Sequence, residues 1–171
     1  MALLSYGSEG IKQKDYQVYI GKYADDVKTA ADTYIGTQNK ANAVSLENEL
    51  TQLGELRADS ISVTAENGDT VEGNNIGEIV LNKACAMMAE LINATPDNIN
   101  ALAELDGQAV VVMIKEKDAR NDVRTVIVIN NVVMSYSENI TGGDIPRASI
   151  SLSRSVANVG NFRIINDIDY S

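Results

Sequence analysis

The chain has 171 residues, of which 44% are hydrophobic, 14 are basic and 24 are acidic. This composition predicts one folded domain rather than a disordered chain, and no apolar run is long enough to cross a bilayer. There is no His and only one Cys, Cys85, which argues against zinc sites, disulfides within the chain and His-dependent catalysis.

The net charge of -10 is concentrated in one window of the sequence. Between Glu47 and Asp106 there are twelve acidic and two basic residues, whereas the rest of the chain holds twelve of each. Binding of nucleic acid by counterion release needs clustered Lys and Arg, so this charge pattern argues against it. The window predicts either a solvated acidic surface or an acidic wall past which an anionic molecule slides without sticking.

The first part of the chain has few clear elements. Residues 1–15 are polar and mixed, which predicts a flexible N-terminal arm. Tyr16, Val18 and Ile20 alternate along a short strand that ends at Gly21.

Residues 22–56 are polar and predict a long loop, although short helices around Ala24–Tyr34 and Ser45–Leu53 are an alternative. Loops of that length usually serve binding or assembly. We therefore expect Tyr34, Ile35 and Leu46 to be buried against a neighbouring subunit.

A β-hairpin is the clearest local feature. Apolar Ile61, Val63 and Ala65 alternate with a polar set, and Asn67-Gly68 is a dipeptide typical of type I′ turns. A second turn is expected at Asn74–Gly77. The polar face of the first strand, which is our candidate for a lumen-facing surface, consists of Ser60, Ser62, Thr64 and Glu66.

One short helix is well signalled, whereas the stretch before it is ambiguous. Thr95-Pro96-Asp97 supplies an N-cap, a Pro at the first position and an acid in the first turn, and Asp106-Gly107 ends the helix. Residues 78–92 suit either a strand or a helix.

The second half of the sequence is β. Ala109–Ile114 is an apolar run typical of a central strand covered on both faces, and residues 125–129, 132–137 and 148–153 follow as further strands. Arg147 and Arg154 flank the last of these and could pair with acids of a neighbouring subunit. The fold class expected is mainly β, a β-sandwich or partly closed β-barrel in a single domain with one short flanking helix.

No catalytic or metal-binding motif is present in the sequence. Asp25-Asp26 and the pair Asp118 and Asp122 lack the spacing of a calcium loop. We therefore expect no enzymatic activity, no catalytic residue, no cofactor and no metal.

Several segments together resemble bacteriophage major tail proteins. They are Leu53-Gly54-Glu55-Leu56 before a strand, the exit Thr70-Val71-Glu72-Gly73, the early Val18–Lys22 and the closing Gly142–Pro146. That family forms tail tubes and is related to the tube proteins of contractile injection systems. The resemblance implies an extended strand at residues 78–92 and subunits that form stacked rings, usually of six, around a channel for DNA.

The same resemblance implies the partners and the location. The partners would be other copies of the chain and further tail proteins, such as tape measure, terminator and baseplate or tip proteins. DNA would be only a non-specific cargo, and no membrane is involved. Location would be the virion tail, after assembly in the host cytoplasm. Two alternatives remain: a tail terminator or head–tail joining protein of the same fold, and a monomeric β-sandwich binding or decoration module.

Overall fold

The computed structural model describes residues 15–53, 60–75, 77–80, 83–92, 95–117, 123–139, 142–143, 147–156 and 162–171. The expected arm at 1–15 therefore lies outside the described residues, except for Asp15. Strands and helices follow in this order: β1 (Asp15–Lys22), α1 (Asp25–Gly36), α2 (Lys40–Glu49), β2 (Thr51–Gln52), β3 (Ser62–Asn67), β4 (Thr70–Gly73), β5 (Gly77–Val80), β6 (Lys83–Ile92), α3 (Pro96–Glu104), β7 (Ala109–Lys117), β8 (Val123–Asn139), β9 (Arg147–Val156) and β10 (Arg163–Asp169).

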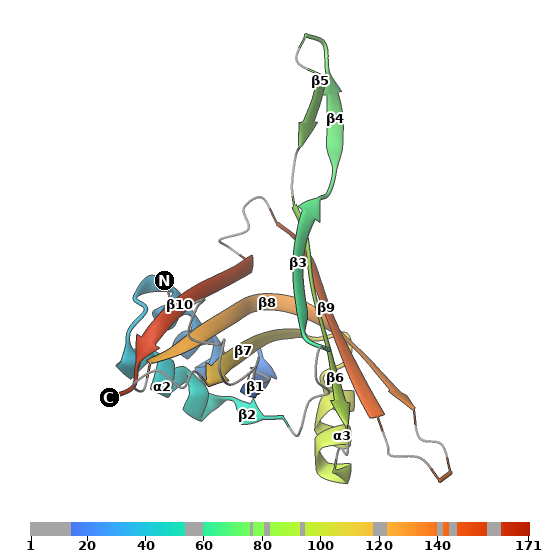
Figure 1. Cartoon of the computed structure of the whole chain (residues 1–171). Helices are drawn as coiled ribbons and strands as arrows, with labels where there is room; N and C mark the ends of the chain where they lie inside the picture. Colours follow the sequence, from blue (N-terminus) through green and yellow to red (C-terminus); the bar gives the residue numbers. More distant parts are fainter. Residues whose placement is uncertain are drawn as a thin grey trace, which may run out of the picture.

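The main sheet is antiparallel and bends at its longest strand. Its order is β2-β1-β7-β8-β9-β6-β3, and β10 also pairs with β8. One edge of β8 pairs with β10 over residues 123–129 and with β9 over residues 133–139. Between these stretches, Asn131 has a φ of 51° and the register with β7 shifts by one residue, which is a β-bulge. The sheet therefore divides into two halves, and Figure 1 shows β3, β6 and β9 standing steeply against β7 and β10.

The central strand β7 is covered on both faces, as its apolar run predicted. Val110, Val112 and Ile114 point into the main core, whereas Val111 and Met113 point into a second core on the other face. The main core lies within the bend of the sheet and includes side chains of β6, β9 and α3. A strand with no polar face is the form expected where both sides of a sheet are buried.

Two helices cover the second core, so the expected long loop at 22–56 is wrong and the alternative of short helices in this range is closer to the structure. α1 and α2 lie within that range and bury Tyr34 and Leu46 to 0% exposure against β1, β7 and β8. Asn39 caps α2, because its side chain accepts a hydrogen bond from the backbone N–H of Asn42 at 2.9 Å. The sequence signal was weak because the only other buried residue of each helix is an alanine, Ala31 in α1 and Ala43 in α2.

The helix α3 confirms its predicted ends. The Thr95 hydroxyl accepts from the backbone N–H of Asn98 at 3.3 Å, and Pro96 occupies the first turn. Gly107, with a φ of 73°, follows the helix and donates its N–H to the Met134 carbonyl at 2.8 Å. That bond attaches the end of α3 to β8, and Leu102 then enters the main core.

The hairpin predicted at Asn67-Gly68 has its turn elsewhere. β3 pairs with β6, and β4 pairs with β5. Both ladders follow one continuous register, in which Ser62 lies opposite Met88 and Thr70 opposite Val80. The four strands therefore form one long hairpin, which we call the extended hairpin. Its turn follows Gly73, where the second turn was predicted at Asn74–Gly77. Asn67-Gly68 lies only at the interruption between β3 and β4. Pairing of β3 with β6 is more stable than the local turn, because it lets Val63 pack on the main core opposite the fully buried Met87.

The mainly β class is confirmed. In the described part of the chain, one antiparallel sheet stays open between β2 and β3 and folds into a partly open sandwich. It carries three helices, whereas the sequence predicted one short flanking helix. The strand expected at residues 78–92 corresponds to β5 and β6. Within the described residues, no helix has the length and apolar character needed to span a membrane.

Candidate functional site

The described residues include no exposed thiol and no cluster of metal-ligating side chains. Cys85 is 2% exposed and lies in the main core, so its thiol is shielded from solvent. Among the described residues, no group of three or more Cys, Asp or Glu side chains lies close enough to hold a metal ion. The features that distinguish this molecule are instead two surfaces, a sheet face and the extended hairpin.

The first surface is the outer face of the sheet half formed by β3, β6, β9 and the end of β8. Alternation sends every second residue of these strands away from the main core, and their register aligns them in rows such as Ser135–Ser151–Met88–Ser62. We call this surface the serine face. It consists of Ser62, Thr64, Glu66, Ala84, Ala86, Met88, Glu90, Val133, Ser135, Ser137, Ser149, Ser151 and Ser153, each exposed or half-buried.

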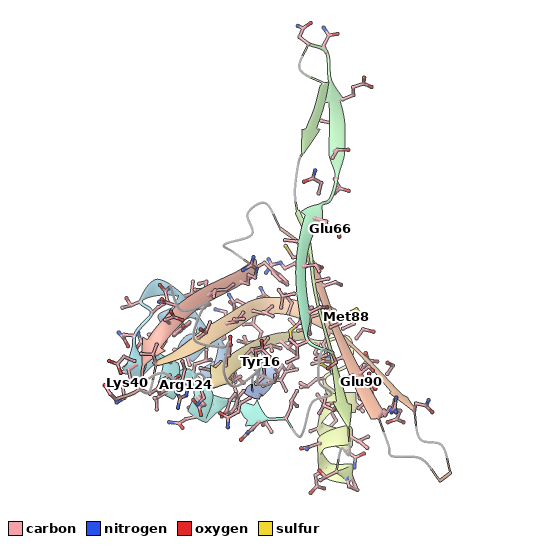
Figure 2. The ribbon with its side chains drawn as sticks, viewed as in Figure 1. Tyr16, Lys40, Glu66, Met88, Glu90 and Arg124 are labelled. Atoms are coloured by element: carbon pink, nitrogen blue, oxygen red, sulfur yellow. The ribbon has the colours of Figure 1, made fainter. Side chains whose placement is uncertain are left out.

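The serine face has small side chains and few charges. Met88 and Val133 are its large apolar members, at 57% and 52% exposure. Glu90 forms an ion pair with Arg147 at 3.6 Å, whereas Glu66 lies where β3 leads into the projecting part of the hairpin. Figure 2 shows Glu66, Met88 and Glu90 following one another along this part of the sheet. The short side chains leave a surface four strands wide with shallow hollows between them.

The four residues predicted to face a lumen share this side of β3. Ser62, Thr64 and Glu66 are exposed members of the serine face. Ser60 is half-buried and continues the ladder: its hydroxyl accepts from the backbone N–H of Glu90 at 3.1 Å and donates to the Glu90 carbonyl at 3.3 Å. The alternation in the sequence identified this strand face correctly, but it could not reveal that β6, β9 and β8 widen it.

Of the residues predicted to contact another subunit, some are buried in the chain's own core and others are exposed or half-buried. Tyr34 and Leu46 are 0% exposed in the chain's own second core, so the structure corrects their proposed interface role. Ile35 is half-buried. Arg147 and Arg154 are exposed, and each has a partner within the chain: Arg147 pairs with Glu90, and the Arg154 guanidinium donates to the Asn131 carbonyl at 2.8 Å. Arg154 therefore holds the β8 bulge in place.

The second surface is the outer part of the extended hairpin. Figure 1 shows β4 and β5 projecting well beyond the rest of the molecule. Thr70, Val71 and Glu72 are all exposed, and Val71 retains 48% of its accessible surface. An isolated two-stranded hairpin is at best marginally stable in water. This projection is therefore suited to contact a partner that covers it.

The described acids of the acidic window lie on several surfaces. Glu66 and Glu90 lie on the serine face, and Glu72 lies on the extended hairpin. Glu47, in contrast, pairs with Lys115 beside the second core at 2.9 Å. The carboxylate of Asp106 accepts the backbone N–H of Tyr136 at 2.9 Å, next to the end of α3. Folding thus distributes these acids over several surfaces.

Comparison of the sequence with models of protein families gave no match, and comparison with curated proteins gave none either.

Proposed function

We propose that this chain is a structural subunit of a bacteriophage tail tube, which assembles with copies of itself into stacked rings around a channel for DNA. The observation that carries the proposal is the pair of surfaces that the described part of the chain leaves uncovered. The serine face is four strands wide, and the extended hairpin projects from its upper end. Neither surface is covered by packing among the described residues, whereas both have a use in a polymer.

The serine face supports the lumen side of the proposal. Its short hydroxyl and methyl groups present no cluster of cations that would hold DNA phosphates. Glu66 adds negative charge, which repels a phosphate backbone over about 8–10 Å at physiological salt. A lumen with this lining lets DNA pass without binding it.

Open sheet edges support self-assembly. β3 is the last strand of the described sheet, and an edge strand has unpaired backbone N–H and C=O groups on its outer side. Charged or Pro-containing edges usually prevent pairing with other chains, but the outer stretch of β3 carries only Glu66 as a charge. Pairing this edge with a neighbouring copy would satisfy those groups.

Electron microscopy of the purified full chain tests the function. Long hollow tubes are the expected result. Single rings would favour the terminator or head–tail joining role, and monomers at all concentrations would favour the binding or decoration module. Either of these results would overturn the tail-tube proposal.

A shortened hairpin tests the role of its outer part. Deleting residues 70–80 leaves Gly68-Asp69-Leu81-Asn82 as the connection between the paired Asn67 and Lys83, so the pairing of β3 with β6 is retained. We expect a folded protein that no longer forms tubes. Glu72→Gln, which keeps the hairpin and removes one charge, is the matched control and should still assemble. Tubes of normal length from the shortened chain would contradict the proposal.

A further inference from the structure

A groove lies on the opposite side of the core from the serine face, and nothing in the proposed function uses it. It has a volume of about 470 Å³ and runs between the end of β1, the start of α1 and one side of α3. Its floor is apolar, formed by side chains that include Ile20, Leu53 and Leu105. The volume is within the range of sites that hold a few side chains or a small molecule.

The rim of the groove is acidic. Asp25, Asp26, Glu49 and Glu104 line it and are all exposed, and Lys22 is the one base beside them. Within the part of the chain that the structure describes, none of these four carboxylates forms an ion pair. An apolar floor surrounded by unpaired carboxylates suits a segment that combines an apolar side chain with Lys or Arg.

The chain itself contains such a segment immediately before β1. Ile11-Lys12-Gln13-Lys14 joins one large apolar residue to two bases, and no acid lies among them. We infer that this stretch of a second copy docks in the groove, with Ile11 on the floor and Lys12 and Lys14 against the acidic rim. The inference rests on the proposed self-assembly and names one of its contacts.

Chain geometry favours a second copy as the occupant. Ile11, which would lie on the floor, is four residues before Asp15, so its Cα reaches at most about 14 Å from that of Asp15. The groove lies at the opposite end of β1, where Ile20 is about 17 Å from Asp15 along the strand. The chain's own segment could approach its groove only by turning back at Asp15 and running fully extended along β1, whereas that of a neighbour meets no such limit.

A peptide-binding experiment tests the contact directly. The receptor is the full chain carrying Lys12→Glu and Lys14→Glu, so that its own segment no longer competes. A fluorescently labelled peptide of residues 1–14 is titrated against it by anisotropy. Adding Glu49→Lys and Glu104→Lys should weaken binding about tenfold or more, because two attractive contacts become repulsive. The matched control adds Glu66→Lys and Glu72→Lys instead, which changes the net charge by the same amount but on the serine face and the extended hairpin. These substitutions should leave the affinity for the peptide within about twofold.

The possible results separate the two proposals. No binding, or equal weakening by both pairs of substitutions, overturns the docking, even if the wild-type chain forms tubes. Binding that depends on the rim acids supports docking, even if microscopy shows rings rather than tubes.

Assembly of the full chain supplies a second measurement, since a charge-reversed rim could also disturb folding. Glu49→Gln and Glu104→Gln, which keep the side-chain shape, should weaken peptide binding less than the Lys substitutions. In the full chain, reversing Lys12 and Lys14 alone or Glu49 and Glu104 alone should reduce polymer yield. Combining all four reversals should restore it. Absence of restoration, with each variant folded by circular dichroism, overturns the pairing.

Discussion

The ion pair between Lys115 and Glu47 offers the sharpest test of how the helices are held on the sheet. The Lys115 ammonium donates to both carboxylate oxygens of Glu47, at 3.0 and 2.9 Å, and joins β7 to α2. It also lies 5.6 Å from the centre of the Tyr19 ring and 5.0 Å from that of Tyr170. Lys115→Met keeps much of the length of the side chain and removes all of these interactions at once.

The expected loss of stability lies between the values for surface and buried pairs. The two side chains are 14% and 23% exposed, so solvent screens the pair only partly. Exposed pairs contribute about 0–1 kcal/mol, whereas breaking a fully buried pair costs about 3–5 kcal/mol. We expect Lys115→Met to cost about 2–3 kcal/mol. Glu47→Gln should cost about 1 kcal/mol, since its amide oxygen can still accept the Tyr19 hydroxyl bond that Glu47 accepts at 3.0 Å.

A double-mutant cycle in urea isolates the coupling of Lys115 with Glu47. Unfolding of the wild type, the two single variants and the double variant gives a coupling free energy, which we expect to be about 1–2 kcal/mol. It should persist in about 1 M salt, because partly buried pairs are less screened than exposed ones. Coupling near zero, or coupling abolished by salt, would show that the pair is open to solvent and that α2 is held by apolar contacts alone.

Three further outcomes follow from the structure. Tyr34→Phe should raise the free energy of unfolding by about 1 kcal/mol, because the Tyr34 hydroxyl is buried without a hydrogen-bond partner among the described residues. If urea denaturation instead shows a lower free energy of unfolding, the hydroxyl has a partner such as a bound water. Gly107→Ala should cost about 1–2 kcal/mol, since its φ of 73° is unfavourable for Ala. The control Gly36→Ala, whose added Cβ would meet no atom within 4 Å, should be neutral or slightly stabilising in thermal unfolding. Burial raises the pKa of Tyr34 and Tyr170 from 10.0 to about 12, so folding favours their neutral forms. The stability that this contributes should be retained below pH 10 and lost as pH rises towards 12. A urea midpoint that stays unchanged from pH 10 to pH 12 would contradict this.

Features signalled by neighbouring residues could be predicted, as α3 and β7 illustrate. The capping bond of Thr95 and the turn at Gly107 depend on residues within a few positions, and the run Ala109–Ile114 needs only burial on both faces. α1 and α2 were harder, because their packing uses Ala31 and Ala43, whose small side chains give little periodic signal. Their stability comes from β1, β7 and β8, which the local sequence does not reveal.

The candidate surfaces depended on pairings distant in sequence. Alternation was enough to place Ser62, Thr64 and Glu66 on one face of a strand. The width of that face required the register of β6 with β9, which joins residues more than 50 positions apart. The turn signal at Asn67-Gly68 was misleading for the same reason, because a strong distant partner for β3 outweighed a favourable local turn. The groove was missed because its floor and rim come from β1, α1, α2 and α3.

The common register of the extended hairpin has a consequence for how its reach can change. Because β3–β6 and β4–β5 follow one register, inserting residues in matched numbers on both strands lengthens the projection without altering any pair in the body. Each added pair extends the hairpin by about 3.4 Å and exchanges the faces of everything beyond it, so two pairs, about 6.8 Å, restore the original facing. The distance between the body and whatever touches the tip is therefore adjustable only in such steps, and a partner spaced at an intermediate distance would meet the wrong face of the hairpin.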